Sequence, residues 1–370
     1  MKILSQGNLG QAASSLGRYI GRSVMQSRGV ERGLDAFERR ALPLLGTPIG
    51  HRIITQPAVR GAADYYHHLR GRDVGTSEID LDIFSGRTSP YSEVVRVDSS
   101  MHRAAVDVMT PIVLKHLREF AAGQEFIHVA DIASGAVPVT VDAIFRAMLA
   151  DPRLRTLGAE YHAMDLQPAQ IEGVKRFPFG QNVTKAFPNQ GDAWDLDKLH
   201  ELGLGYDWVT ANLHLHHGTP KDIYDFSQHL LKMLKPGGLF TGHVVVMPDG
   251  QPYLRRPSAK PGQTPGEDMA VPGLTIPVVD EYEPGHTRWL DAMVESYRDY
   301  LRSEGVREEW VEAICGHIAQ SDYPLSLELL QAVFERAGLI VKVHAFKDHA
   351  THGDHPHAQY FGVIEARRPD

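Results

Sequence analysis

Cysteine is almost absent from this chain of 370 residues, which contains only Cys315. A single cysteine cannot form a disulfide within the chain, and it cannot build a cysteine-based zinc site. A reducing, intracellular setting therefore fits best. No segment reaches the roughly 18 apolar residues that span a membrane, and no apolar stretch of signal length follows residues 1–8. We accordingly expect a cytoplasmic protein without a membrane partner.

Positive charge is also scarce, since 38 lysines and arginines face 46 acidic residues and give a net charge of −8. A chain that coats phosphate backbones is usually basic, so we do not expect a nucleic-acid partner. The remaining composition is ordinary for a globular protein, and the length favours two or three domains. Histidine is the one residue type in surplus, with 20 copies.

The spacing of apolar residues changes near residue 124, and this change divides the chain. Residues 1–122 are mainly helical by their apolar spacing, and Gly123 ends a helix predicted over 101–120. Short apolar runs that predict strands then alternate with helical stretches. The predicted strands cover 126–130, 160–164, 182–186, 206–211 and 239–246. Repeated strand–turn–helix units predict an α/β fold whose parallel sheet has helices on both faces.

An insertion interrupts this pattern. Eight prolines fall within 248–286, and two helical stretches follow them. A long proline-rich segment in a compact enzyme is usually a lid or a flexible loop. A helix over 325–337 and two strands that form an antiparallel hairpin complete the chain. The predicted parts are a helical N-terminal or lid region at 1–122, a core at 123–247, a lid insertion at 248–322 and the end of the core at 323–370.

Polar side chains follow the first four predicted strands. They are Asp131 with Gly135, then Asp165, Asp192 and Asn212. In an open α/β sheet, ligands bind beyond the carboxyl ends of the strands. A glycine turn lets the backbone approach a ligand closely, and a carboxylate after the second strand accepts hydrogen bonds from a ribose diol. This layout predicts a nucleoside cofactor, although Gly-x-Gly-x-x-Gly follows none of the strands.

The order of these segments resembles the class I S-adenosylmethionine-dependent methyltransferases of small-molecule type. Residues 126–137, 161–168, 191–193, 206–217 and 234–238 are similar to five of the family's motifs, in the family's order. The resemblance covers roughly 124–247 and 322–366. It implies a Rossmann-like sheet of seven strands, mostly parallel with the last strand antiparallel. It also implies S-adenosyl-L-methionine as the cofactor.

The resemblance also implies which residues hold the cofactor. They are Asp131, Ala133, Ser134, Gly135, Asp165, Leu166, Asp192, Ala193, Asn212 and His214. One departure is visible, because the family's first motif usually has glycines at the positions of Ala133, Gly135 and Val137. Only Gly135 is kept. Ala133 is still small, so a cofactor can approach the turn.

Histidines just past the fourth strand supply candidate bases. A sulfonium is a strong electrophile, so a weak base is enough when the acceptor is a hydroxyl or an amine. We predict His216 and His217 as catalytic residues, with His216 favoured, and packed or surface histidines are the alternative interpretation. The tract 349–357 contains four further histidines and could reach the site as an acid–base or metal group, or be a solvated turn. We assign no metal ligand.

The variable parts of the chain should supply the acceptor pocket. Tyr91, Arg96, His243 and Trp289 are the candidate substrate residues, although Trp289 could belong to the core of the lid and His243 could be structural. A lid that excludes water fits a small-molecule substrate. Residues 212–215 also lack the Asn/Asp-Pro-Pro-Tyr/Phe of enzymes that methylate planar nitrogens, which disfavours DNA or RNA bases.

The sequence therefore predicts an enzyme that transfers a methyl group to an oxygen or nitrogen atom of a small molecule, such as a secondary metabolite. One alternative is a different reaction of the same cofactor, namely an intramolecular displacement or a cyclisation. Another alternative is a catalytically silent scaffold of the same fold. A homodimer through the N-terminal helices is an option that the sequence leaves open.

Overall fold

The computed structural model describes residues 99–135, 138–250, 252–255, 269–280, 288–321, 324–346 and 361–370. The chain divides into two compact units, 1–75 and 76–370, and all described residues belong to the second unit. Residues 1–98 of the predicted helical region, which include Tyr91 and Arg96, lie outside the described residues, as does the histidine tract at 349–357.

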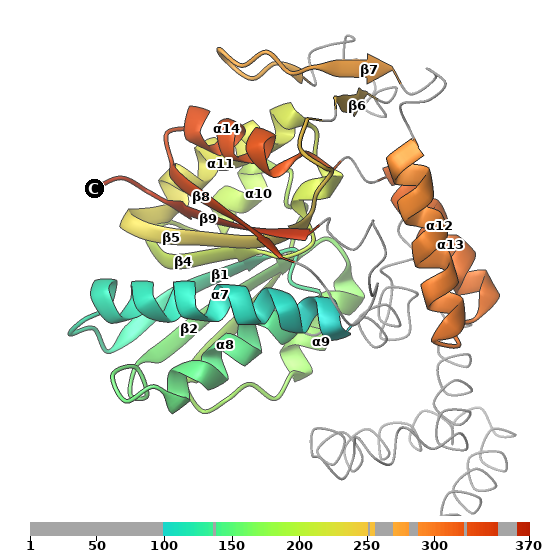
Figure 1. The fold of residues 1–370 in the computed structure, drawn as a ribbon. Helices are drawn as coiled ribbons and strands as arrows, with labels where there is room; N and C mark the ends of the chain where they lie inside the picture. The colour runs from blue at the N-terminus through green and yellow to red at the C-terminus, as the bar shows by residue number, and fades with distance from the viewer. Residues whose placement is uncertain are drawn as a thin grey trace, which may run out of the picture. The chain divides into compact units, whose positions relative to one another are not determined.

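A sheet of seven strands in the order β3-β2-β1-β4-β5-β9-β8 forms the centre of this unit (Figure 1). The strands are β1 Phe126–Ile132, β2 Gly158–Asp165, β3 Val183–Gln190, β4 Tyr206–Ala211, β5 Leu234–Val245, β8 Ile340–Phe346 and β9 Phe361–Arg367. Strands β1 to β5 pair in parallel, whereas β9 is antiparallel to both β5 and β8. The predicted fold class is confirmed: seven strands, mostly parallel, with the last one antiparallel.

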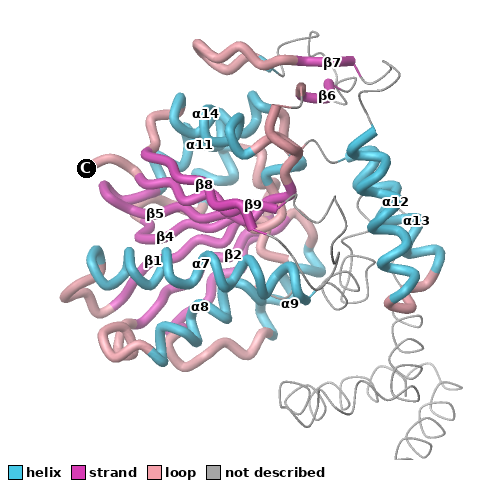
Figure 2. The backbone as a smooth tube through the Cα atoms, viewed as in Figure 1, coloured by secondary structure: helices cyan, strands magenta, loops and turns pink. Residues whose placement is uncertain are grey.

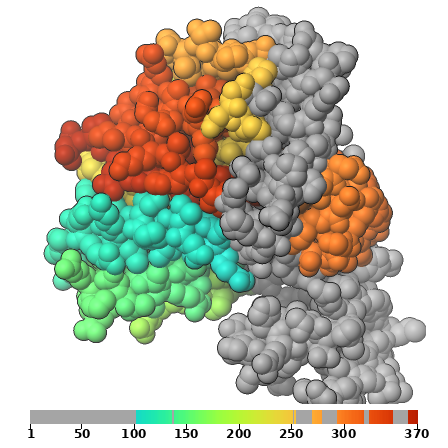
Figure 3. Space-filling model, viewed as in Figure 1, coloured from blue at the N-terminus to red at the C-terminus, as the bar shows by residue number. Residues whose placement is uncertain are grey.

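Helices cover both faces of the sheet (Figure 2). One face carries α7 Ser99–Phe120, α8 Val139–Ala150 and α9 Pro168–Arg176. The other face carries α10 Leu196–Glu201, α11 Pro220–Met233 and α14 Leu327–Arg336. In the space-filling view, the surface of α7 borders the C-terminal segment that contains β8 and β9 (Figure 3). Two separate apolar cores therefore form, one on each side of the sheet.

Local signals explain most of these boundaries. Helix α7 presents Ala105, Met109, Val113 and Leu117 as a fully buried stripe at helical spacing, and Gly123 follows it with φ +85°. Thr219 caps α11 with a capping box. The sequence did not reveal α9 and α10, because both are short and α9 is polar on average.

Residues 234–238, which precede the predicted fifth strand, form a bulge inside β5. Its pairing with β4 jumps from Tyr206–Leu234 to Trp208–Leu239. Gly237 takes φ +74° there, which glycine adopts without steric conflict. Lys235 from the same bulge donates a hydrogen bond of 2.6 Å to the fully buried Asp207, which also accepts one from the backbone of His128. This bulge thus ties the starts of β1, β4 and β5 together.

The insertion contributes two short strands and two helices to the described part of the chain. Strands β6 Tyr253–Arg255 and β7 Val278–Asp280 pair in parallel. Helices α12 Arg288–Ser303 and α13 Glu308–Ser321 pack on one another through a core that includes Leu301, Val311 and Cys315. Among the described helices, none combines the length and the apolar character that crossing a bilayer requires. The part boundaries at 122, 247 and 322 stay predictions.

Candidate cofactor and acceptor site

The turn after β1 takes left-handed backbone conformations at two residues. Ala133 has φ +56° and Gly135 has φ +65°. Left-handed backbone is free for glycine and costs an alanine about 1–2 kcal/mol. The residue at the family's first glycine position therefore keeps the glycine conformation in spite of its methyl group. The adjacent Ser134 is tied to β2, because its N–H donates to the carbonyl oxygen of Met164 at 3.0 Å.

Asp165, the last residue of β2, reaches this turn. One of its carboxylate oxygens accepts the N–H of Gly135 at 3.0 Å, and the other accepts the N–H of Gln167 at 3.0 Å. Burial raises the pKa of Asp165, and these backbone hydrogen bonds oppose the rise. A carboxylate has about four lone-pair sites, so Asp165 is able to accept a further donor beside these backbone groups. No described atom lies within 4 Å of the position that a Cβ of Gly135 would take, so the turn borders open space.

Asp131 is a buried acid below the turn. Its side chain is 2% exposed, and Tyr161 on β2 donates a hydrogen bond of 2.7 Å to one of its oxygens. The other oxygen has no hydrogen-bond partner among the described residues. Burial raises the pKa of Asp131 to about 7, the Tyr161 hydrogen bond opposes this, and the charge of Asp165 adds to it. Asp131 therefore lies next to Asp165 with spare acceptor capacity.

A side chain that follows β3 contacts a side chain that follows β4. Asp192 is exposed and accepts the N–H of Trp194 at 2.9 Å, while Ala193 between them is buried. The Trp194 ring stacks on the ring of His214, with centroids 4.2 Å apart. Leu166, by contrast, is 47% exposed at the end of β2. The sequence reasoning missed Trp194, although it directly follows the predicted Asp192-Ala193 pair.

Asn212 and Leu213 connect the ends of β4 and β5. The side chain of Asn212 donates to Thr210 and accepts the N–H of His243 at 3.4 Å. Leu213 takes φ +52°, and its N–H donates to the carbonyl oxygen of His243 at 2.8 Å. The left-handed residue allows the chain to turn from β4 into the short 3₁₀ helix Leu215–His217.

Three of the predicted histidines lie together around that 3₁₀ helix. His214 and His216 are buried, each 5% exposed, and the rings of His216 and His217 are 4.1 Å apart. Burial lowers the pKa of His214 to about 3. Burial also lowers the pKa of His216 well below 6.5, and several neighbouring histidines add to the effect. The ring of His317 on α13 lies 5.2 Å from that of His217, so the insertion adds a histidine to the group.

His243 on β5 forms a second buried pair with His102 on α7. His243 is fully buried and His102 is 8% exposed, and their rings meet edge to face at 5.5 Å. None of the four ring nitrogens has a hydrogen-bond partner among the described residues. Burial lowers the pKa of His102 to about 4 and that of His243 well below 6.5. Sequence reasoning missed His102, yet its spacing to Ala105 and Met109 places it on the buried stripe of α7.

The other predicted substrate residue, Trp289, belongs to helix α12. The structure thus gathers Ala133, Ser134, Gly135, Asp131 and Asp165 at the ends of β1 and β2. It gathers the histidines at the ends of β4 and β5. The roles assigned to all these residues stay predictions.

No protein-family model and no curated protein matches this chain. Among solved structures, it is similar to the carbon methyltransferase of CurJ (14% identity, TM-score 0.47, 93% of this chain and 71% of that chain). It is also similar to loganic acid methyltransferase with SAH (10% identity, TM-score 0.47, 76% of this chain and 96% of that chain). A third similar structure is described as an O-methyltransferase of Nostoc punctiforme (14% identity, TM-score 0.43, 83% of this chain and 68% of that chain). The fold is that of the class I methyltransferases, as the strand order of the sheet itself establishes.

Proposed function

We propose that this chain binds S-adenosylmethionine beyond the ends of β1 to β4 and transfers its methyl group to an oxygen or nitrogen atom of a small molecule. The observation that carries the proposal is the junction of Gly135 with Asp165, where a carboxylate with spare acceptor capacity lies beside open space. A ribose diol requires such an acceptor. The residues present therefore fit the cofactor.

Each element would supply one part of the cofactor site. Asp165 and Leu166 follow β2 and would meet the ribose, while Asp192 and Ala193 would meet the adenine. The turn from Ala133 to Gly135 would admit the amino-acid part of the cofactor, with Asp131 below it. Asn212 and His214 would close the site at the end of β4.

The bound cofactor supplies a methyl group on a sulfonium, which is a strong electrophile. The protein's own residues have to hold the acceptor in line, exclude water and take up the proton that the acceptor loses. We assign the proton to the imidazole of His216, with His217 beside it. Because its pKa is lowered well below 6.5, the His216 ring is neutral at pH 7 and is a weak base, and a weak base is enough for transfer from a sulfonium.

A small molecule suits the acceptor side of this proposal better than a macromolecule does. The proposed base His216 is only 5% exposed, and a small acceptor reaches a buried side chain more readily than a macromolecule does. The net charge of −8 gives no general attraction to phosphate backbones. We further propose a cytoplasmic location and a role in secondary metabolism. The insertion and the segment with Tyr91 and Arg96 are the proposed lid.

The first test is calorimetry of the full chain with S-adenosylmethionine and S-adenosylhomocysteine. Saturable binding of both supports the cofactor site, and the absence of binding of either supports the silent scaffold. The second test incubates the protein with methyl-labelled cofactor and a metabolite extract, followed by mass spectrometry. A labelled product and S-adenosylhomocysteine support methyl transfer. Methylthioadenosine without a labelled product supports the alternative displacement chemistry and contradicts the proposal.

A further inference from the structure

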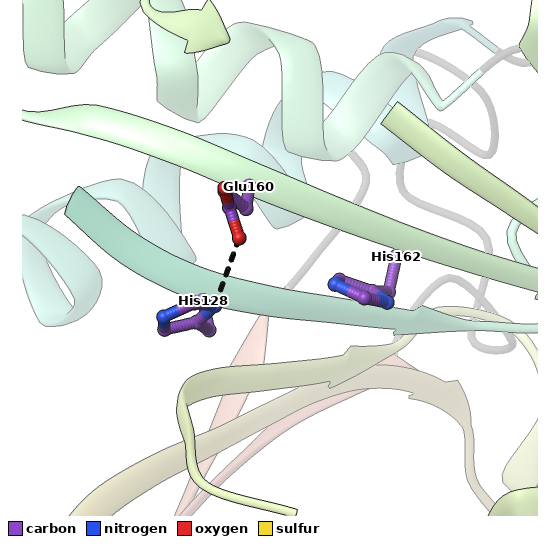
Figure 4. Close-up of side chains that lie close together, drawn as sticks. All are labelled: His128, Glu160 and His162. Atoms are coloured by element: carbon purple, nitrogen blue, oxygen red, sulfur yellow. Dashed lines mark ion pairs between the residues drawn. The ribbon is translucent and has the colours of Figure 1, made fainter. Parts of the chain in front are cut away.

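Three potential metal ligands lie on the sheet, away from the carboxyl ends of the strands. They are His128 on β1 together with Glu160 and His162 on β2 (Figure 4). His128 pairs with Glu160 in the register of the two strands, and His162 is two residues further along β2. The three side chains therefore extend from the same face of the sheet, and their ligand atoms all lie within 4.8 Å of one another.

Around these three side chains, this face of the sheet is partly open to solvent. The side chain of His128 is 43% exposed, and that of Glu160 is 22% exposed. On the edge strand β3, the side chain of Lys185 is 63% exposed. An ion and its water ligands could reach the three side chains without moving the fold.

The separation of His128 and Glu160 suits a tetrahedral metal. Zinc binds imidazole nitrogen and carboxylate oxygen at about 2.0–2.2 Å, so two ligands of a tetrahedron are about 3.4 Å apart. The Nδ1 atom of His128 lies 3.4 Å from Oε2 of Glu160. Two imidazoles and one carboxylate, with water in the fourth position, form an established zinc ligand set. The strand register fixes all three backbone positions, so any adjustment to an ion falls to the side chains.

Neighbouring residues orient the ligands. Lys185 donates a hydrogen bond of 3.0 Å to Oε1 of Glu160, which leaves Oε2 directed toward His128. The ring of His162 stacks on Phe187 with centroids 4.6 Å apart and meets Tyr206 edge to face at 5.4 Å. Such outer contacts hold ligands in place at metal sites. The competing explanation is a network of Lys185, Glu160 and His128 that binds no metal.

We propose that His128, Glu160 and His162 bind a divalent transition-metal ion, with Zn²⁺ as the best fit, which ties β1 to β2. The ion would not take part in methyl transfer. His128 and His162 each precede a site carboxylate, Asp131 or Asp165, by three residues, which is about 10 Å along a strand. The metal site is therefore independent of the proposed function, and either can fail alone.

Calorimetry of the metal-free full chain with ZnCl₂ tests the proposal. Because the four histidines of 349–357 also attract metals, the titration is repeated in a background where all four are replaced by asparagine. We expect one Zn²⁺ per chain to remain in that background. His128→Asn, Glu160→Gln and His162→Asn should each weaken this binding by at least about tenfold. His200→Asn, an exposed histidine on α10, should leave it unchanged.

Two further measurements separate a metal site from an ion-pair network. Lys185→Met removes the hydrogen bond that orients Glu160 but also a cation that repels the ion, so it should weaken Zn²⁺ binding less than the loss of a ligand does. Zn²⁺ should also raise the thermal unfolding midpoint of the unmutated chain, a shift that chelation reverses. The absence of a stoichiometric Zn²⁺ in the asparagine background overturns the proposal. Zn²⁺ affinity that stays the same after all three ligand substitutions overturns it as well. So does a loss of Zn²⁺ affinity in Lys185→Met that is as large as the loss in the ligand variants.

Discussion

The backbone N–H of Gly135 donates a hydrogen bond of 3.0 Å to the carboxylate of Asp165, thirty residues further along the chain. This contact joins the turn after β1 to the end of β2. Gly135 is in the left-handed backbone region, and the Asp165 carboxylate is partly buried. The conformation of the turn and the position of the Asp165 carboxylate are thus coupled, and a change in one should alter the other.

Replacing Asp165 tests that coupling. Asp165→Ala removes an acceptor for two backbone N–H groups and for the proposed ribose diol. Hydrogen bonds to a charged group contribute about 1.5–3 kcal/mol, so the dissociation constant for S-adenosylhomocysteine should rise about tenfold or more. Calorimetry measures it, with the exposed Glu201→Gln as the control. An unchanged dissociation constant in Asp165→Ala would show that the ribose binds elsewhere.

Ala133→Gly should stabilise the fold, because φ +56° is strained for alanine. Relief of about 1–2 kcal/mol is partly offset by the larger entropy of glycine in the unfolded chain, so we expect a net gain of about 0.5–1 kcal/mol. Ala147→Gly, in the right-handed helix α8, should instead lose about 1 kcal/mol. Urea unfolding of both variants measures the contrast. A loss of stability in Ala133→Gly comparable to that in Ala147→Gly would refute the strain.

Local patterns were sufficient to predict most of the fold. The apolar run of β4 and the glycine after α7 are signals within a few residues, and the strand at 206–211 and the helices predicted over 101–120 and 325–337 are all present. The pairs His102–His243 and His128–Glu160 were not predictable in this way. Each depends on which strands or helices become neighbours, and a single sequence does not contain that register. Asp131 is intermediate, since its position was predicted but its partner Tyr161 was not.

Asp131→Asn should increase stability above neutral pH. A pKa of about 7 in the folded protein exceeds the ordinary 3.8, so the folded state binds more protons between these values. Stability therefore falls as pH rises from about 4 to 7, by at most about 4 kcal/mol. Asparagine removes the charge, so the variant should lose this part of the slope. Urea unfolding between pH 5 and 8 tests it, with the exposed Asp197→Asn as control. Identical slopes in wild type and Asp131→Asn would contradict the buried charge.

His216→Gln should lower turnover far more than cofactor affinity if His216 takes the acceptor proton. General-base catalysis contributes a factor of about 100 or more. Because the pKa of His216 lies well below 6.5, the base is already neutral at pH 6, and kcat should be flat from pH 6 to 8. The labelled-product assay measures both quantities. Full turnover in His216→Gln, or an acidic limb near pH 6.5 in the unmutated enzyme, would assign the proton to another group.

His102→Leu should make the protein less sensitive to acid. The pKa of His102 is about 4 in the folded protein against an ordinary 6.5, so the unfolded state binds more protons between these values. Stability therefore falls as pH drops from about 6.5 to 4, by about 3 kcal/mol for this group. Leucine does not titrate and leaves no buried nitrogen without a partner, so the variant should retain more stability at pH 5 than the unmutated chain. Unfolding at pH 5 and pH 7 measures the difference, with His200→Asn as the exposed control. An equal loss on acidification in both proteins would mean that His102 gains a proton without opening the fold.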